Sequence, residues 1–289
     1  MMSLFVLNSA FTVCDAADAP DITFGVFTNP ERVTIQDYSQ DAMEPFISLD
    51  GKYLFFNNSN NAQDTNLYYA TRIDDLTFQF QGEIGGVNST GLDAVPSMDT
   101  NNKFYFVSNR SYPQTFSTIY WCDFSNGSVS NVALVPGISK HKLGDVNFDA
   151  GISPDGGTLY FVDGVFNGGS VPQRASIAIA RRKGGHFVRL ADSSTIMRKI
   201  NTGGLNYAPC PTPSDLEFFF TRVDPANLGD GPKIFTATRS KKSKPFGTSV
   251  QIAAITGFVE APTLSADGKS LYFHKQENNV FVIYRVTRP

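Results

Sequence analysis

Alternating apolar and polar positions define a short unit near the end of the chain. Residues 260–273, EAPTLSADGKSLYF, predict two short strands joined by a tight turn. Leu271 and Phe273 fall on one face of the second strand and Tyr272 on the other, the period of two typical of a strand. Asp267-Gly268 suits the turn, because Gly adopts positive φ easily and Asp can bond its own backbone. One hairpin cannot bury its apolar face alone, so the pattern predicts further copies.

Four more copies of this unit precede it. They open at Ser48, Ser97, Ser153 and Thr212, while Ser265 opens the last copy. Successive copies are therefore roughly 50 to 60 residues apart, a spacing typical of repeat folds. The fourth copy departs most, because Thr-Pro-Ser stands where the others have Ser-x-Asp.

Each copy continues into further strands. A third strand follows the second after a polar loop, and we expect these third strands at 67–72, 119–124, 176–182, 234–239 and 280–288. A fourth stretch with a Phe or Val anchor usually comes next. Four strands in a unit of this length are the blade of a β-propeller. The sequence therefore predicts an all-β, five-bladed propeller of four-stranded antiparallel blades over residues 20–289, with blades starting near 42, 92, 147, 206 and 259.

The last blade lacks its outer strand, because the sequence stops directly after the third one. The N-terminal segment, ITFGVF at 22–27 followed by NPERV at 29–33, resembles the fourth-strand stretches of the other copies, with its strand expected at about 22–28; the alternative is a disordered leader. We predict that this segment completes the last blade and closes the ring, since closure removes an open sheet edge.

The repeat resembles the TolB-like propeller repeat, P-x-x-S-x-D-G-x-x-L-Y-F. The residues that carry the likeness include Pro45, Ser48, Asp50 and Gly51 in the first copy, and their counterparts in the third and fifth. Repeats two and four lack the Gly after the Asp position. The resemblance implies a propeller over about residues 22–288 and leaves the activity open, because proteins with this repeat serve as scaffolds, binding modules and domains attached to enzymes.

Composition narrows the choice of ligand. Charged residues make up 18% of the chain and the net charge is −3, so the basic stripe of a nucleic-acid binder is missing and we expect no nucleic-acid partner. The three cysteines form no CxxC motif, and Cys122 and Cys210 fall in predicted strands, where they are expected to be buried. No cofactor is expected, although acids in the channel leave Ca²⁺ open as a ligand.

Residues 1–19 differ from the rest of the sequence. They are apolar but too short to span a membrane, and they end in an Ala-x-Ala pattern at Ala17 and Ala19. We interpret them as a signal for export to the periplasm or the outside; the alternative is a frayed tail on a cytoplasmic protein.

Propeller geometry converts sequence position into a candidate site. The loop entering each innermost strand and the loop after each second strand lie on one face of a propeller, so their residues are expected to meet at the channel mouth. The acids that enter the inner strands are Glu44, Asp93 and Asp149. The expected ligand-binding residues around them are Asn58, Arg110, Asp163, Arg222, Glu260, His274 and Lys275.

Two functions fit this candidate site. The first is a binding or scaffold propeller that takes a small molecule, a glycan or a protein partner at the channel mouth and on its long loops. The second is a carbohydrate-active enzyme, a hydrolase or lyase, with the three acids as its acid–base set, as in five-bladed arabinanases and xylosidases. In that case Arg110 and Arg222 would clamp an acidic ligand. The acids have a structural alternative, since each can accept backbone N–H groups and brace neighbouring blades. The repeated Ser-x-Asp is interpreted as structural.

Overall fold

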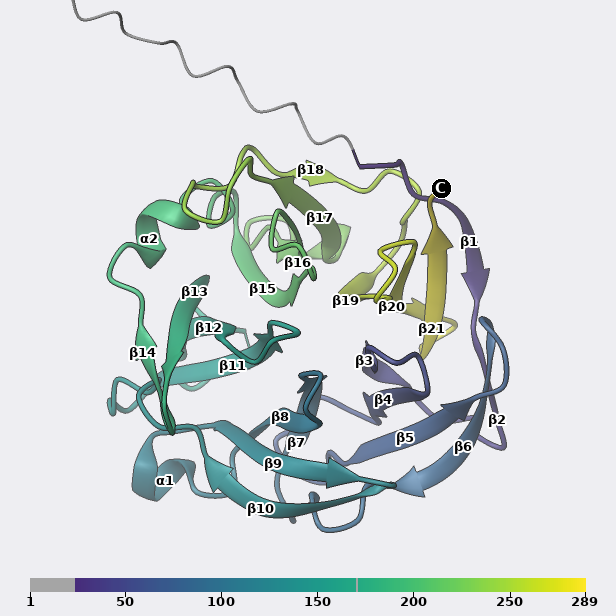
Figure 1. The fold of residues 1–289 in the computed structure, drawn as a ribbon, viewed down its shortest axis with the longest axis horizontal. Helices are drawn as coiled ribbons and strands as arrows, with labels where there is room; N and C mark the ends of the chain where they lie inside the picture. Colours follow the sequence, from purple (N-terminus) through teal and green to yellow (C-terminus); the bar gives the residue numbers. More distant parts are fainter. Residues whose placement is uncertain (1–23, 170) are drawn as a thin grey trace, which may run out of the picture.

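The chain forms a closed ring of five antiparallel β-sheets around a central channel (Figure 1). The computed structural model describes residues 24–169 and 171–289, so the predicted export signal lies outside the described residues. The five-bladed all-β prediction is confirmed. Among the described residues, no helix is long and apolar enough to cross a membrane.

The innermost strands line the channel, and each blade adds its other strands outward. Blade one has β3 (Met43–Ile47), β4 (Tyr53–Asn57), β5 (Leu67–Arg72) and β6 (Thr77–Glu83); blade two has β7 (Asp93–Met98), β8 (Lys103–Ser108), β9 (Ile119–Ser125) and β10 (Ser128–Leu134); blade three has β11 (Asp145–Ile152), β12 (Thr158–Val165), β13 (Arg174–Lys183) and β14 (His186–Arg189); blade four has β15 (Leu205–Pro211), β16 (Glu217–Val223), β17 (Lys233–Thr238) and β18 (Val250–Gln251); blade five has β19 (Val259–Leu264), β20 (Ser270–Glu277) and β21 (Val280–Thr287).

Helical structure in the described residues is confined to single turns between strands. These are α1 (Tyr112–Thr115) before β9, α2 (Ser193–Ile196) after β14, and the 3₁₀ turn η1 (Leu228–Asp230) in the loop before β17.

An N-terminal strand does complete the last blade, though later in the sequence than predicted. β1 (Thr28–Arg32) pairs with β21, whereas the prediction placed this strand at about 22–28. Phe27 is the buried anchor that precedes it, packed edge-to-face against Phe219 of blade four. Pro30 is tolerated in β1 because an outer strand does not need every N–H group for pairing.

The same segment also binds the first blade, which the sequence did not predict. β2 (Thr34–Gln36) pairs in parallel with β6 and makes blade one five-stranded. The ring is therefore closed by one continuous segment that bonds to both blades at the junction. Arg288, near the other end of the chain, adds a bidentate ion pair to the buried Glu217 of blade four.

Apolar contacts between neighbouring blades hold the ring together. Each of five buried clusters joins two adjacent blades. The Leu-Tyr-Phe type strands supply both sides: Leu54 and Phe56 face blade five, while Phe55 packs against Phe104 of blade two. This explains the 13% aromatic content, because the second strand of each blade is largely buried on both faces. The cysteines Cys122 and Cys210 are buried and free, as expected.

The Ser-x-Asp turns have the structural role predicted for them. Ser48 Oγ donates to Asp50 Oδ1 at 2.5 Å and accepts from the Tyr53 N–H at 2.9 Å. The turns at Ser153 and Ser265 repeat this pattern. The Ser hydroxyl lowers the pKa of the partner carboxyls in those two turns.

Candidate functional site

Every innermost strand carries a bulge at the same place. The register of β3, β7, β11, β15 and β19 shifts against the second strand of its blade. One residue of each bulge has positive φ, and these residues are Glu44 (49°), Val95 (57°), Asp149 (49°), Ala208 (49°) and Ala261 (55°). In a regular strand successive side chains alternate between faces, but a bulge re-aims them. Two consecutive residues of one strand can therefore face the channel mouth.

The channel mouth opens into one cavity of about 730 Å³. Its lining includes both consecutive residues of two bulges, Ala94 with Val95 and Phe148 with Asp149. Glu44, Tyr207 and Glu260 line it from the other three blades. Below it the channel narrows to a space of about 60 Å³ walled by bulge-flanking residues such as Pro45, Pro96, Pro209 and Pro262. A cavity of this size fits a drug-sized ligand, which would enter from the loop side.

Three carboxyl groups converge on this cavity, from blades one, three and five. They belong to Glu44, Asp149 and Glu260, and all three line the cavity. Glu44 and Asp149 are 6% and 5% exposed. Burial, followed by the nearby charges of Asp149 and Glu260, raises the pKa of Glu44 well above its usual range. Burial also raises the pKa of Asp149 to about 7.

Each carboxyl group has a different set of partners. Asp149 Oδ2 accepts the Ala208 N–H at 2.8 Å. Glu44 Oε1 accepts from Asn60 at 3.1 Å, whereas Glu44 Oε2 is buried and has no hydrogen-bond partner among the residues that the structure describes. Glu260 accepts from the Tyr207 hydroxyl and from His274 Nε2, the latter at 3.1 Å. Burial and Glu260 raise the pKa of Tyr207, so this hydroxyl stays protonated and donates.

His274 connects Glu44 and Glu260 from behind the cavity wall. It is fully buried, and its Nδ1 lies 3.0 Å from the Glu44 backbone nitrogen. A backbone N–H can only donate, so Nδ1 is the acceptor and Nε2 carries the proton that Glu260 accepts. His274 therefore supports the site and does not line the cavity.

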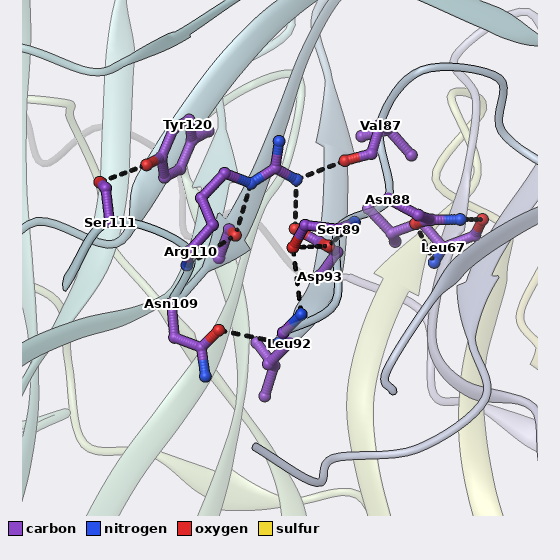
Figure 2. Close-up of polar contacts among 12 residues, drawn as sticks. Leu67, Val87, Asn88, Ser89, Leu92, Asp93, Asn109, Arg110, Ser111 and Tyr120 are labelled. Atoms are coloured by element: carbon purple, nitrogen blue, oxygen red, sulfur yellow. Dashed lines mark hydrogen bonds and ion pairs between the residues drawn. The ribbon is translucent and has the colours of Figure 1, made fainter. Parts of the chain in front are cut away.

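Asp93 does not occupy the position that the sequence analysis gave it. The residue of blade two that matches Glu44 and Asp149 is Val95, and Asp93 lies two residues earlier. Its fully buried carboxylate pairs with Arg110 and accepts the Ser89 N–H and hydroxyl at 2.5 and 2.7 Å. Figure 2 shows the Arg110 guanidinium between this carboxylate and the Val87 carbonyl. Asp93 is thus a structural brace inside blade two.

The other residues expected to bind a ligand also have partners within the protein. Asp163 pairs with Arg189 and Lys140. Arg222 donates to Asn206, the Ile200 carbonyl and Ser249. Asn58 accepts the Asn66 N–H, and Lys275 lies 3.9 Å from Glu277 and over the Tyr284 ring. Of the seven residues expected to bind a ligand, only Glu260 lines the cavity, and of the three predicted acids Glu44 and Asp149 line it as well.

The sequence analysis missed several residues of the cavity wall. The polar ones include Asn60 and Asn61, from the loop after β4. The aromatic ones include Phe148, Tyr207 and Phe258. Asn60 and Asn61 follow a second strand and Phe258 precedes an inner strand, which was a usable signal, whereas Phe148 and Tyr207 lie inside β11 and β15. In the part of the chain that the structure describes, no group of three or more His, Cys, Asp and Glu side chains could hold a metal ion.

Solved structures with a similar fold include glycoside hydrolases. Zg3597, a family 117 glycoside hydrolase from the marine bacterium Zobellia galactanivorans, matches 91% of this chain and 90% of its own with a TM-score of 0.58 and 13% identity. The catalytic domain of the Coprinopsis cinerea GH62 α-L-arabinofuranosidase matches 91% and 96% with a TM-score of 0.56 and 11% identity. These similarities establish the fold alone. A putative TolB from Agrobacterium tumefaciens matches 83% and 72% with a TM-score of 0.48 and 16% identity.

Sequence comparisons identify no family. No model of a protein family matches the chain, and no curated protein matches it.

Proposed function

We propose that the protein is a glycoside hydrolase whose active site is the cavity at the channel mouth. The observation that carries this proposal is the convergence of Glu44, Asp149 and Glu260, from three blades, on one ligand-sized cavity. Glycoside hydrolysis needs one carboxyl group that gives a proton and another that accepts one, held in environments that separate their pKa values. The fold similarity to glycoside hydrolases is consistent with this chemistry and does not by itself assign it.

In this proposal Glu44 is the acid. Burial and the neighbouring acids raise its pKa, which favours the protonated form, and its unpartnered Oε2 leaves one oxygen free to hold that proton. As the glycosidic C–O bond breaks, Glu44 gives the proton to the leaving oxygen. The resulting Glu44 carboxylate takes up a proton from water before the next turnover.

Glu260 is the base. The Tyr207 hydroxyl and His274 Nε2–H donate to its oxygens, and two donors suit a carboxylate. It takes one proton from the water whose oxygen bonds to the anomeric carbon. Asp149, bonded to the Ala208 N–H, and Glu260 both raise the pKa of Glu44 when they are ionised, which favours the protonated form of Glu44. Overall, water is added across the glycosidic bond: Glu44 delivers one proton to the leaving oxygen, and Glu260 takes one proton from the water.

Hydrolysis is tested with 4-nitrophenyl glycosides of neutral sugars. The expected result is release of 4-nitrophenol by the wild type and a fall in kcat of about 100-fold or more in Glu44→Gln and Glu260→Gln, the size of a general acid or base contribution. Asp93→Asn is the matched control, because this acid lies outside the cavity; it should retain its kcat while folded. An equal loss in the folded Asp93→Asn protein would refute the assignment.

A non-catalytic binding or scaffold function is the second candidate. The observation that favours it is that the acids also brace the ring: Asp149 bonds across to blade four, and His274 links blade five to the Glu44 backbone. The TolB-like likeness of the repeats fits this candidate. It predicts no turnover, a lower melting temperature for Asp149→Ala, and a ligand or protein partner that raises the wild-type melting temperature by binding the native state.

A further inference from the structure

The cavity differs strongly from one side to the other. The side chains of Asn60, Asn61 and Asn109 line it from the loops of blades one and two, and Asn60 donates to Glu44. The wall from blades three, four and five is formed largely by apolar side chains, among them Phe148, Phe166, Val171, Val223, Leu228 and Phe258. A ligand that fills this space needs a hydroxyl-rich part and an apolar part.

Part of the apolar wall is open to solvent. Leu228 in η1 is 49% exposed, Val171 is 46% exposed and Phe258 is 37% exposed. Phe258 is held in place by edge-to-face packing on Phe281, with ring centroids 5.8 Å apart. Three large apolar side chains that line one cavity and remain exposed make an apolar surface that a bound group can cover.

The charges of the cavity restrict the ligand further. Among the described residues that line it, none is Lys, Arg or His, and the carboxyl groups are those of Glu44, Asp149 and Glu260. Arg110 and Arg222, which could have held an anion, are engaged in contacts within blades two and four. A uronic acid, a sulfated sugar or a phosphorylated sugar would meet repulsion without a countercharge.

We infer that the ligand is an uncharged sugar joined to an apolar aglycone, with the sugar at the carboxyl groups and the aglycone on Leu228, Phe258 and Val171. This inference rests on the proposed function, because it assigns the substrate class of the same site. The carboxyl groups and the Asn61 side-chain amide can bond sugar hydroxyls, which act as both donors and acceptors. The aglycone gains affinity by covering apolar surface that water otherwise contacts.

The test compares phenyl and methyl glycosides of the same neutral sugar and anomer by isothermal titration calorimetry, with the corresponding phenyl glucuronide as the charged probe. For the sugar that binds, the phenyl glycoside should bind the wild type at least about tenfold more tightly than the methyl glycoside. The glucuronide should bind more weakly than its neutral counterpart. Leu228→Ser and Phe258→Ala should remove the advantage of the phenyl group and leave the methyl glycoside unchanged. Leu228 lies half-exposed in a loop, so its variant tests the site without disturbing the blade cores.

The outcomes separate this inference from the proposed reaction. Tight phenyl-glycoside binding without hydrolysis would refute the hydrolase proposal and support the inferred ligand class. Equal affinity for phenyl and methyl glycosides, or a preference for the glucuronide, would overturn the ligand class even if the neutral glycosides are cleaved. No binding of any probe at millimolar concentration would overturn it as well.

Discussion

A hydroxyl group that joins blades four and five offers a direct test of how the ring is held. Thr221 is fully buried, and its Oγ1 accepts the N–H of the bulge residue Ala261 at 3.0 Å. Thr221→Val keeps the side-chain shape and removes this acceptor. An unpaired buried donor costs about 1–3 kcal/mol. For a chain of this size each kcal/mol lowers the melting temperature by about 2–4 °C, so we expect a fall of about 4–8 °C for a cost of about 2 kcal/mol.

The same blade provides the matched control. Thr236 in β17 has a buried hydroxyl without a hydrogen-bond partner. Thr236→Val therefore removes an unpaired polar group and should leave the stability unchanged or raise it. Differential scanning calorimetry and urea unfolding of the two variants and the wild type measure the contrast. Equal melting temperatures for the two variants would refute the idea that side-chain acceptors at the bulges stabilise the ring.

Three further predictions concern charge. A carboxyl group whose pKa is higher in the folded than in the unfolded state contributes stability below its unfolded-state pKa, and this contribution is lost as the pH rises through the folded-state pKa. For Asp149, a rise in pKa from 3.8 to about 7 corresponds to on the order of 4 kcal/mol in the free energy of unfolding. Wild type should therefore lose stability relative to Asp149→Asn between pH 4 and pH 8 in urea unfolding, and parallel curves would contradict this. Arg110→Met should cost about 1–3 kcal/mol, because it unpairs buried Asp93, yet leave glycoside affinity unchanged in calorimetry; a large loss of affinity would place Arg110 in the site. Arg288→Met should cost about 3–5 kcal/mol in the same unfolding assay, since it leaves a buried blade-four carboxylate without its cation. An unchanged midpoint would mean that apolar contacts alone hold blades four and five together.

The fold was predictable because it repeats. Each hairpin has a strand period of two and a turn with its own chemistry, and five weak signals at regular spacing support one another. The closing strand was predicted with the wrong bounds, since ITFGV and the real strand at Thr28–Arg32 are both plausible edge strands. Only pairing with β21 distinguishes them. The parallel strand β2 left no sequence signal, because three residues show no period.

The site was harder to predict because a bulge breaks the rule on which sequence analysis relies. Asp93 was aligned with Glu44 and Asp149 as an acid entering an inner strand, whereas the bulge residue of blade two is the Val95 before Pro96. Alignment on the residue before Pro would have found it in four of the five blades. Glu260 was expected as one of several ligand contacts, and its meeting with Glu44 depends on the bulge.

The bulge positions also bear on how such a protein can change its chemistry. Left-handed backbone costs a residue with a side chain roughly 1–2 kcal/mol, yet the five positions hold Glu, Val, Asp, Ala and Ala. The surrounding ring therefore imposes this left-handed backbone conformation, whichever of these residues stands at the position. Side chains as different as a carboxylate and a methyl group therefore occupy equivalent places at the channel mouth. A lineage of such rings could gain, lose or relocate a catalytic group at these positions with the same backbone, at the cost of any bond between blades that the side chain makes, as Asp149 does.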